Sequence, residues 1–343
     1  MHGGDIYSHP QVQYDFSSNI NPLGIPPEMV RAMEEGLKHT HRYPDLQYRA
    51  LREALATYGG VSPQEVVVGN GVVDILDGAM ALASSMVLVH PGFSEYEERG
   101  RIRGMDMTHV VMEEPFHLDV SAVEEALKPG ALLVLASPNN PTGYTLSQEE
   151  LLALLKAVKS QGGLLLLDEA FVEFTPVDYN AIDYIEDYPL LVCRGATKIF
   201  GLPGIRLGYG FTERERAELL SQRLLPWRIN TLADEVGQLA CHQEKFFEDT
   251  RNYVAKERAR LKAAMEELGL QVYDSQANYL LIKTRQLTVE EIYRGLLERG
   301  ILIRKCDNYR GLGEGFFRIA VRAAHDNGIL IGAMEELFTE REK

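Results

Sequence analysis

Cysteine is scarce in this chain, and its scarcity restricts what can hold the fold together. The three cysteines, Cys193, Cys241 and Cys306, are too few and too far apart for a disulfide framework or a zinc site. No apolar run approaches the roughly 20 residues that a membrane-spanning helix needs. The N-terminus "MHGGDIYSHP" also lacks the basic-then-apolar pattern of a signal peptide. These absences predict a reduced, cytoplasmic protein without membrane contact.

Positive charge is also in the minority. Lysine and arginine number 35 against 50 acidic residues, which gives a formal net charge of −15 at pH 7. Nucleic-acid binding needs a basic footprint, so the charge argues against nucleic acid and against anionic membranes. Residues 299–322 are an exception, with six basic residues and two acidic ones. This stretch is either a solvated basic face or part of a pocket for an anionic small molecule.

The length and the apolar pattern predict the fold class. A chain of 343 residues is long enough for two domains. From about residue 48, short apolar runs such as "EVVVGNG", "MVLVHPGF" and "GLLLLDEAF" alternate with helical patterns. Strands that are apolar on both faces and separated by helices predict an α/β fold whose mostly parallel sheet is covered on both sides. We expect a large domain over residues 41–235 and a smaller α+β domain built from residues 1–40 and 236–343.

Polar groups stand where the predicted strands end. They are Gly69–Gly71, Pro91–Phe93, Asn139–Asn140, Asp168 and Lys198. In open α/β sheets, ligands bind beyond the carboxyl ends of the strands. These groups are therefore candidates for a single site.

A lone carboxylate and a lone amine follow two of these buried runs. Asp168 ends "LLLLD", and Lys198 comes shortly after "LLVCRG". A buried carboxylate is costly unless a cation pairs with it, so a structural ion pair is one interpretation. The other is a pyridoxal phosphate site, where the lysine binds the cofactor's aldehyde and the aspartate pairs with its ring nitrogen.

The chain also offers the other groups that this cofactor would need. Its phosphate needs an arginine, a hydroxyl and the free N–H groups that open a helix. Its ring needs a stacking partner, and its phenolate oxygen needs a donor. The candidates for the phosphate are Arg206, Thr197, Gly71, Val72 and Val73, with Phe93 for the ring and Asn140 for the phenolate oxygen.

Four segments, "SPNNPTG", "LDEAF", "ATKIFGLPGIRLGY" and "FFRIAVR", resemble the fold-type I pyridoxal-phosphate aminotransferases, in the histidinol-phosphate aminotransferase branch. The resemblance covers nearly the whole chain. It implies the fold-type I transferase architecture, pyridoxal 5'-phosphate as cofactor, and a homodimer in which Tyr43 reaches the cofactor phosphate of the neighbouring subunit. For the site it implies Lys198 as the Schiff-base lysine, Asp168 at the ring nitrogen, Asn140 at the ring hydroxyl, Phe93 on the ring, Arg206 and Thr197 at the phosphate, and Arg318 at the substrate carboxylate.

Two positions depart from that family's pattern. Gly195 stands where relatives often carry a serine that also binds the phosphate, which predicts a weaker phosphate anchor. Phe171 stands where aminotransferases typically have a tyrosine that donates to the ring oxygen. The missing donor argues against simple amino transfer.

Near the N-terminus, "HGGD" and "DFSSNINPLG" are similar to the threonine-phosphate decarboxylases of cobalamin side-chain synthesis, which are aminotransferase-like enzymes. The similarity implies loss of CO2 from O-phospho-L-threonine or a close analogue such as phosphoserine. Amino transfer from histidinol phosphate to 2-oxoglutarate is the alternative, and a non-catalytic cofactor-binding protein is a third interpretation. Substrate positioning would decide between the two reactions. The candidates for a clamp on the substrate phosphate are His2, Arg304 and Arg322, with Ser18 and Asn19 as substrate-binding residues near the mouth of the site.

Two further features have simpler interpretations. The histidines of "HTH" at residues 39–41 have the spacing of metal ligands, but no further ligands stand nearby. A helix-end cap is the simpler interpretation, and we predict no metal site. Cys306 stands next to Lys305, and nearby cations would lower the pKa of its thiol.

Overall fold

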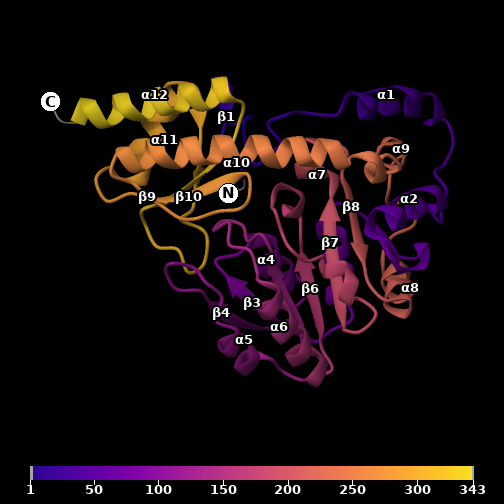
Figure 1. The fold of residues 1–343 in the computed structure, drawn as a ribbon. Coiled ribbons are helices and arrows are strands. Elements are labelled where there is room, and N and C mark those ends of the chain that lie inside the picture. Colours follow the sequence, from indigo (N-terminus) through magenta and orange to yellow (C-terminus); the bar gives the residue numbers. More distant parts are fainter. Residues whose placement is uncertain (1–2, 342–343) are drawn as a thin grey trace.

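The computed structural model of the protein describes residues 3–341. In this part of the chain the largest sheet has seven strands, in the order β2-β8-β7-β6-β5-β3-β4 (Figure 1). Of these seven, β8 alone runs in the direction opposite to the other six, so the sheet is mostly parallel, as predicted. The strands are β2 (Val66–Asn70), β3 (Ser85–His90), β4 (Asp106–Val111), β5 (Leu132–Ala136), β6 (Leu164–Asp168), β7 (Leu190–Gly195) and β8 (Leu207–Phe211).

Helices cover both faces of this sheet, because each strand turns apolar side chains to either side. On one face, Leu166 and Leu191 belong to a core shared with α3, α4 and α8. On the other face, Leu165 and Val192 belong to the core shared with α2, α5 and α6. The doubly covered sheet predicted from runs such as "LLLLD" is confirmed. The helices are α2 (Arg49–Gly59), α3 (Val72–Met80), α4 (Ser94–Ile102), α5 (Val120–Ala126), α6 (Gln148–Ser160) and α8 (Arg214–Arg223).

The C-terminal part of the chain forms a smaller α+β unit. Its antiparallel sheet has the order β12-β13-β10-β9. The long helix α10 runs along the top of the molecule, above the large sheet and beside the small one (Figure 1). The elements are α10 (Glu244–Glu267), β9 (Gln271–Val272), β10 (Tyr279–Lys283), α11 (Val289–Glu298), β12 (Arg304–Lys305), β13 (Phe316–Ala320) and α12 (Ala324–Arg341).

The N-terminal segment contacts two different parts of the molecule. β1 (Tyr14–Asp15) pairs in parallel with β11 (Ile301–Leu302), whereas α1 (Pro27–Gly36) packs against α9 (Thr231–Gly237). The division at residues 40 and 235 stays a prediction.

Among residues 3–341, no helix combines the length and the apolar character that crossing a bilayer requires.

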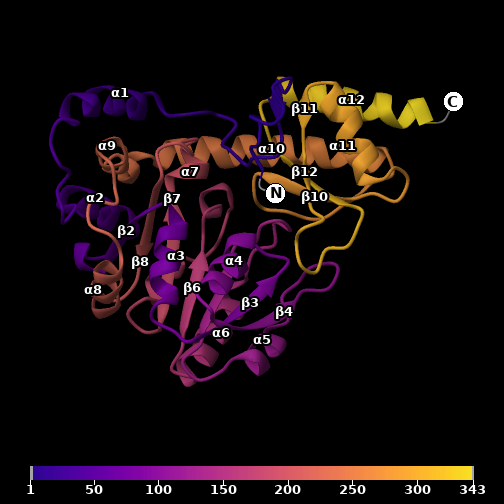
Figure 2. The same ribbon diagram turned by 180° about the vertical axis from the view of Figure 1, so that it is seen from behind.

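The carboxyl ends of the parallel strands lie at the edge of the large sheet that faces α10 and the small unit (Figure 2). The one-turn helix α7 (Ala196–Ile199), which carries Lys198, follows β7 directly at this edge. Asp168 ends β6 and pairs with Cys193 of β7, so the carboxylate and the amine come from adjacent strands. The fold therefore brings together the residues that the sequence places at strand ends.

Candidate active site

A cavity of about 240 Å³ lies at this edge of the sheet. Of the ten residues predicted to bind the cofactor, all except Tyr43 line it. Parallel strands end at one edge, which is why residues far apart in sequence gather here. The lining residues are Gly71, Val72, Val73, Phe93, Tyr96, Ala136, Asn140, Asp168, Ala170, Phe171, Gly195, Thr197, Lys198 and Arg206.

Lys198 places its amine in the wall of this cavity. Its Nζ lies 5.8 Å from the centre of the Phe171 ring. Desolvation lowers the pKa of Lys198 to about 8; the positive charge of Arg318 acts in the same direction, and the carboxylate of Asp168 opposes both. An amine with this pKa is partly neutral near pH 7, and only the neutral amine is a nucleophile.

The lowered pKa predicts a pH dependence for cofactor loading. When the cofactor-free protein is mixed with pyridoxal 5'-phosphate, the rate constant for loading should rise about tenfold per pH unit below the pKa of the amine. It should level off above about pH 8, because the pKa of Lys198 is about 8. Stopped-flow absorbance of the lysine-bound cofactor measures this rate. A rate that keeps rising toward the pKa of an ordinary lysine would contradict the prediction.

Asp168 is a buried carboxylate whose hydrogen bonds hold it in place without neutralising it. Its Oδ2 accepts a hydrogen bond from the Tyr96 hydroxyl at 2.5 Å, and its Oδ1 accepts one from the Ala170 backbone N–H at 3.0 Å. Burial raises the pKa of Asp168, while these two bonds and the charge of Lys198 lower it. A cationic group in the cavity would stabilise the carboxylate further.

Tyr96 is a site residue that the sequence analysis missed. It lies on α4, three positions after Phe93, and the two rings meet edge to face at 5.6 Å between centroids. A spacing of three residues places two side chains on the same side of a helix. The spacing of Phe93 and Tyr96 in "PGFSEY" was the sequence signal that could have identified Tyr96 as a site residue.

We expect Tyr96→Phe to lower kcat by roughly tenfold or more, because hydrogen bonds to charged groups contribute about 1.5–3 kcal/mol. Without the Tyr96 hydroxyl, Oδ2 of Asp168 loses its donor and the pKa of the carboxylate rises. Steady-state kinetics and the pH dependence of the cofactor's absorbance measure both effects. Tyr144→Phe is the matched control, since the Tyr144 hydroxyl bonds Glu150 outside both cavities. Equal losses in the two variants would show that only packing was disturbed.

One end of the cavity is suited to an anion. Gly71, with a φ of +78°, precedes α3, and no side chain caps the first N–H groups of this helix. The guanidinium of Arg206 lies against this turn, since a Cβ on Gly71 would be 2.4 Å from Nη2 of Arg206. Among residues 3–341, Arg206 forms no ion pair. A helix start and an unpaired guanidinium together attract a phosphate.

The same end is built by close backbone contact. A Cβ on Gly208, in β8, would lie 2.4 Å from the carbonyl carbon of Gly71 and 2.4 Å from the backbone nitrogen of Val72. A Cβ on Gly195 would lie 3.0 Å from the Leu207 carbonyl oxygen. Glycine at 195 therefore matches the tight spacing here, and a serine would require the neighbouring backbone to shift. The weaker phosphate anchor predicted from Gly195 stays a prediction.

A second cavity, of about 220 Å³, adjoins the first and shares Phe93, Asn140, Phe171 and Lys198 with it. Four of the predicted substrate residues line it, and they come from the N-terminal segment and the small unit. The lining residues are Gly3, Ser17, Ser18, Asn19, Phe93, Ser94, Asn140, Phe171, Lys198, Arg304, Tyr309 and Arg318. Tyr309 was not predicted, and its loop position gives no periodic signal.

Two buried arginines of this second cavity have no carboxylate partner within the described part of the chain. Arg318 donates to Asn140 Oδ1 and, at 2.6 Å, to the Ser17 carbonyl oxygen, while its Nε is buried without a partner. Arg304 donates to the Lys305 carbonyl and to Asn308 Oδ1, both at 2.7 Å. Their charges are thus available to an anion.

Three predicted residues are not placed in these cavities. Arg322 lines neither cavity and donates to Asp326 Oδ2 at 3.3 Å and to the Asp15 carbonyl at 3.2 Å, and its contact with the substrate stays a prediction that this position does not support. Tyr43 is 79% exposed and packs on the Trp227 ring at 4.9 Å, so its reach into a neighbouring subunit stays a prediction. His2 lies outside the described residues.

The structure also corrects the expected direction of the pKa shift of the Cys306 thiol. It is fully buried in the hydrophobic core. Burial raises its pKa to about 12, and the charges of Arg318 and Arg304 only partly oppose that rise. The expected lowering of its pKa is therefore wrong.

Comparison with known proteins assigns the chain to a family whose members share this fold. Residues 11–337 match the family model described as aminotransferase class I and II. A protein of Caldanaerobacter subterraneus, whose name proposes a threonine-phosphate decarboxylase, is 37% identical over 99% of this chain and 94% of its own length. The histidinol-phosphate aminotransferase of Thermoanaerobacter pseudethanolicus is 32% identical over 97% and 95%. The solved histidinol-phosphate aminotransferase of Clostridium acetobutylicum superposes with a TM-score of 0.90, at 29% identity and over 95% and 99% of the two chains.

The fold and the site define a fold-type I enzyme that depends on pyridoxal 5'-phosphate. The chain belongs to the aminotransferase class I and II family. The residues present fit the cofactor typical of that family. Asp168 offers a buried carboxylate for a cationic ring nitrogen, Lys198 offers an amine of lowered pKa, and the uncapped start of α3 beside Arg206 offers a phosphate site.

Proposed function

We propose that this protein decarboxylates O-phospho-L-threonine to an aminopropanol phosphate and CO2, as a step in cobalamin side-chain synthesis. One observation carries the proposal: two buried guanidiniums without carboxylate partners, those of Arg304 and Arg318, line one cavity beside Lys198. An O-phospho amino acid has two anionic groups, a carboxylate and a phosphate. Each arginine then has a partner, and burial of the two cations is offset.

The positions of the arginines suggest which group each would bind. Arg318 bonds Asn140, which lines both cavities, so it lies next to the reacting end of the site. We assign the substrate carboxylate to Arg318. Arg304 stacks on the Tyr309 ring at 5.3 Å and lies in the cavity that contains Ser18 and Asn19. We assign the substrate phosphate to Arg304 and Ser18, because they offer a guanidinium and a hydroxyl.

Two anion-binding arginines would fix how the substrate lies against the cofactor, and that orientation selects the bond that breaks. The bound cofactor supplies an electron sink for the electrons left on the α-carbon. When the Cα–carboxylate bond breaks, its electron pair stays with the α-carbon and CO2 leaves. The protonated amine of Lys198, which lines both cavities, is then placed to donate a proton to that carbon. Phe171 offers no hydroxyl at the cavity wall, in agreement with the departure from aminotransferases noted in the sequence.

Amino transfer between histidinol phosphate and 2-oxoglutarate is the second candidate. The similarity to histidinol-phosphate aminotransferases supports it, because those relatives are nearly as close to this chain. The same arginines could bind the phosphate of one substrate and a carboxylate of the other. Breaking the Cα–H bond would require only a different orientation of the substrate over Lys198.

A product assay on the cofactor-loaded protein separates the two reactions. The substrates are O-phospho-L-threonine, O-phospho-L-serine, unphosphorylated L-threonine, and histidinol phosphate with 2-oxoglutarate. We expect CO2 and an amino-alcohol phosphate from the phosphorylated amino acids, and little from L-threonine. Glutamate formed only with histidinol phosphate would overturn the proposal in favour of amino transfer.

Arg304→Gln tests the assignment of the substrate phosphate. We expect KM for O-phospho-L-threonine to rise roughly 10- to 100-fold, because a charge-assisted hydrogen bond contributes about 1.5–3 kcal/mol. The effect on kcat should be smaller. Arg322→Gln is the matched control, since Arg322 lines neither cavity. A similar rise in KM for both variants would contradict the assignment.

We also propose that the protein is a homodimer in which Tyr43 reaches the partner's cofactor phosphate. The exposed pair of Tyr43 and Trp227, together with Leu225 at 74% exposure, leaves apolar surface that a second copy would cover. Sedimentation of the loaded protein tests the dimer. Tyr43→Phe should weaken cofactor retention without changing the oligomeric state.

A further inference from the structure

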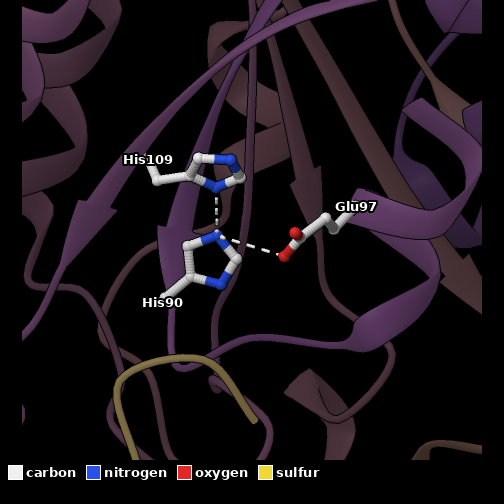
Figure 3. A group of neighbouring side chains, drawn as sticks. All are labelled: His90, Glu97 and His109. Atoms are coloured by element: carbon white, nitrogen blue, oxygen red, sulfur yellow. Dashed lines mark hydrogen bonds and ion pairs between the residues drawn. The ribbon is translucent and has the colours of Figure 1, made fainter. Parts of the chain in front are cut away.

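Three side chains outside both cavities gather near the edge of the large sheet. His90 ends β3, and His109 lies in the neighbouring β4. Glu97 lies on α4, and its carboxylate points toward the two histidines (Figure 3). Nε2 of His90 is 2.9 Å from Nδ1 of His109 and 4.0 Å from Oε2 of Glu97. The three donor atoms lie within 4.8 Å of one another.

The sheet register fixes the two histidines on the same face. His109 pairs with Leu88 in the parallel β3–β4 ladder, and His90 lies two residues after Leu88. Side chains two positions apart in a strand point to the same side. His90 is only 5% exposed, so its ring has little freedom to turn away.

The donor chemistry of this group is that of a transition-metal site. A nitrogen–nitrogen contact of 2.9 Å requires that one of the two ring nitrogens carries a lone pair. Two imidazoles and one carboxylate suit Zn²⁺ and similar ions, whereas Mg²⁺ and Ca²⁺ prefer sites made of oxygen ligands.

We propose that His90, Glu97 and His109 bind a divalent transition-metal ion of the Zn²⁺ class, with water as the fourth ligand. Ligand atoms of a tetrahedral zinc site lie about 3.3 Å apart, as follows from Zn–N bonds of about 2.0–2.1 Å. The histidines would open slightly from 2.9 Å, and the carboxylate would approach from 4.0 Å. A cavity of about 780 Å³, lined by His90 and Glu97, gives an ion and its water access to the group.

Arg310 competes with the metal for the carboxylate. Its Nε and Nη2 donate to Oε2 and Oε1 of Glu97 at 3.1 and 2.6 Å. The pair is partly exposed, at 48% for Arg310 and 31% for Glu97, so solvent weakens it. A metal ion and the guanidinium are both cations, and each therefore lowers the affinity of Glu97 for the other.

The experiment is titration of the cofactor-loaded protein, without any amino-acid substrate, with Co²⁺ as a spectroscopic substitute for Zn²⁺. We expect one equivalent to bind and to give the visible absorption of Co²⁺ with nitrogen ligands, and Zn²⁺ to displace it. His109→Ala and Glu97→Gln should each weaken binding by about tenfold or more. Arg310→Gln should tighten it roughly two- to fivefold, the range expected for removal of an exposed ion pair.

His41→Ala is the control, because His41 lies on the surface and its ring bonds only the Lys38 carbonyl in the described structure. It should leave Co²⁺ binding unchanged. Far-ultraviolet circular dichroism and the cofactor's absorbance check that each variant is folded, and Glu97→Gln decides the question if His109→Ala does not fold. The proposal is overturned if the native protein gives no Co²⁺ absorption. It is also overturned if His109→Ala and Glu97→Gln bind Co²⁺ as tightly as the native protein.

Discussion

Replacing Lys198 by alanine is expected to lower turnover by at least about 10³-fold. Lys198 is the only lysine that lines either cavity in the described part of the chain. Its amine has a pKa lowered to about 8, so it can bind the cofactor's aldehyde and later carry a proton. Alanine removes both functions. The measurements are kcat and the near-visible absorbance of the lysine-bound cofactor.

The matched control is Lys159→Ala, since the Lys159 amine bonds the Asp187 carbonyl at 2.8 Å on the surface. It should retain full activity. Small primary amines should partly restore turnover to Lys198→Ala, because they fit the space vacated by the side chain and supply the missing base. Activity of Lys198→Ala close to that of the native protein would remove the basis of the whole site assignment.

Asp168→Asn is expected to lower kcat by two to four orders of magnitude. Breaking a buried ion pair costs about 3–5 kcal/mol. The amide cannot stabilise a cationic ring nitrogen, although it fills nearly the same space and can still bond Tyr96. Steady-state kinetics measures the loss. Asp307→Asn, on the surface of the small unit, is the control and should have no such effect.

Although Asp168→Asn should lower kcat, it should raise the stability of the cofactor-free protein. Burial raises the pKa of Asp168 above its unfolded value. Its contribution is therefore most favourable at acid pH and is lost as the pH rises through the unfolded and then the folded pKa. Near pH 7 the ionised group costs stability, and Asp168→Asn should raise the Tm of the cofactor-free protein by about 1–3 °C. Thermal unfolding without and with cofactor measures this. A fall in both Tm and kcat would instead indicate a damaged fold.

The fold was largely predictable from the sequence because its signals are local. The four leucines of "LLLLD" are apolar at every position, which a strand needs only when both faces of its sheet are covered. Asp168 and Lys198 could be found because they interrupt those runs at strand ends, where ligands bind.

The remaining site residues depend on contacts that sequence spacing does not reveal. Tyr96 looks like an ordinary core aromatic until α4 places its hydroxyl on Asp168. Arg318 and Arg322 belong to one basic stretch, but only Arg318 lies within β13, and Arg322 turns to Asp326 instead. His90 and His109 are far apart in sequence and meet through the register of β3 and β4. No metal site could be predicted from "HTH", and the histidine pair was overlooked.

The contact between Gly208 and the Gly71–Val72 turn has a consequence for how such an enzyme can diverge. Main chain meets main chain there, and a Cβ at position 208 would lie 2.4 Å from two backbone atoms. No side chain can be added at position 208 without moving β8 or the turn that leads into α3. The opposite end is built from side chains such as Ser18, Asn19 and Arg304, each of which can be exchanged singly. Selection for a new substrate, in nature or in a library, can therefore act on the second cavity while the cofactor end stays unchanged.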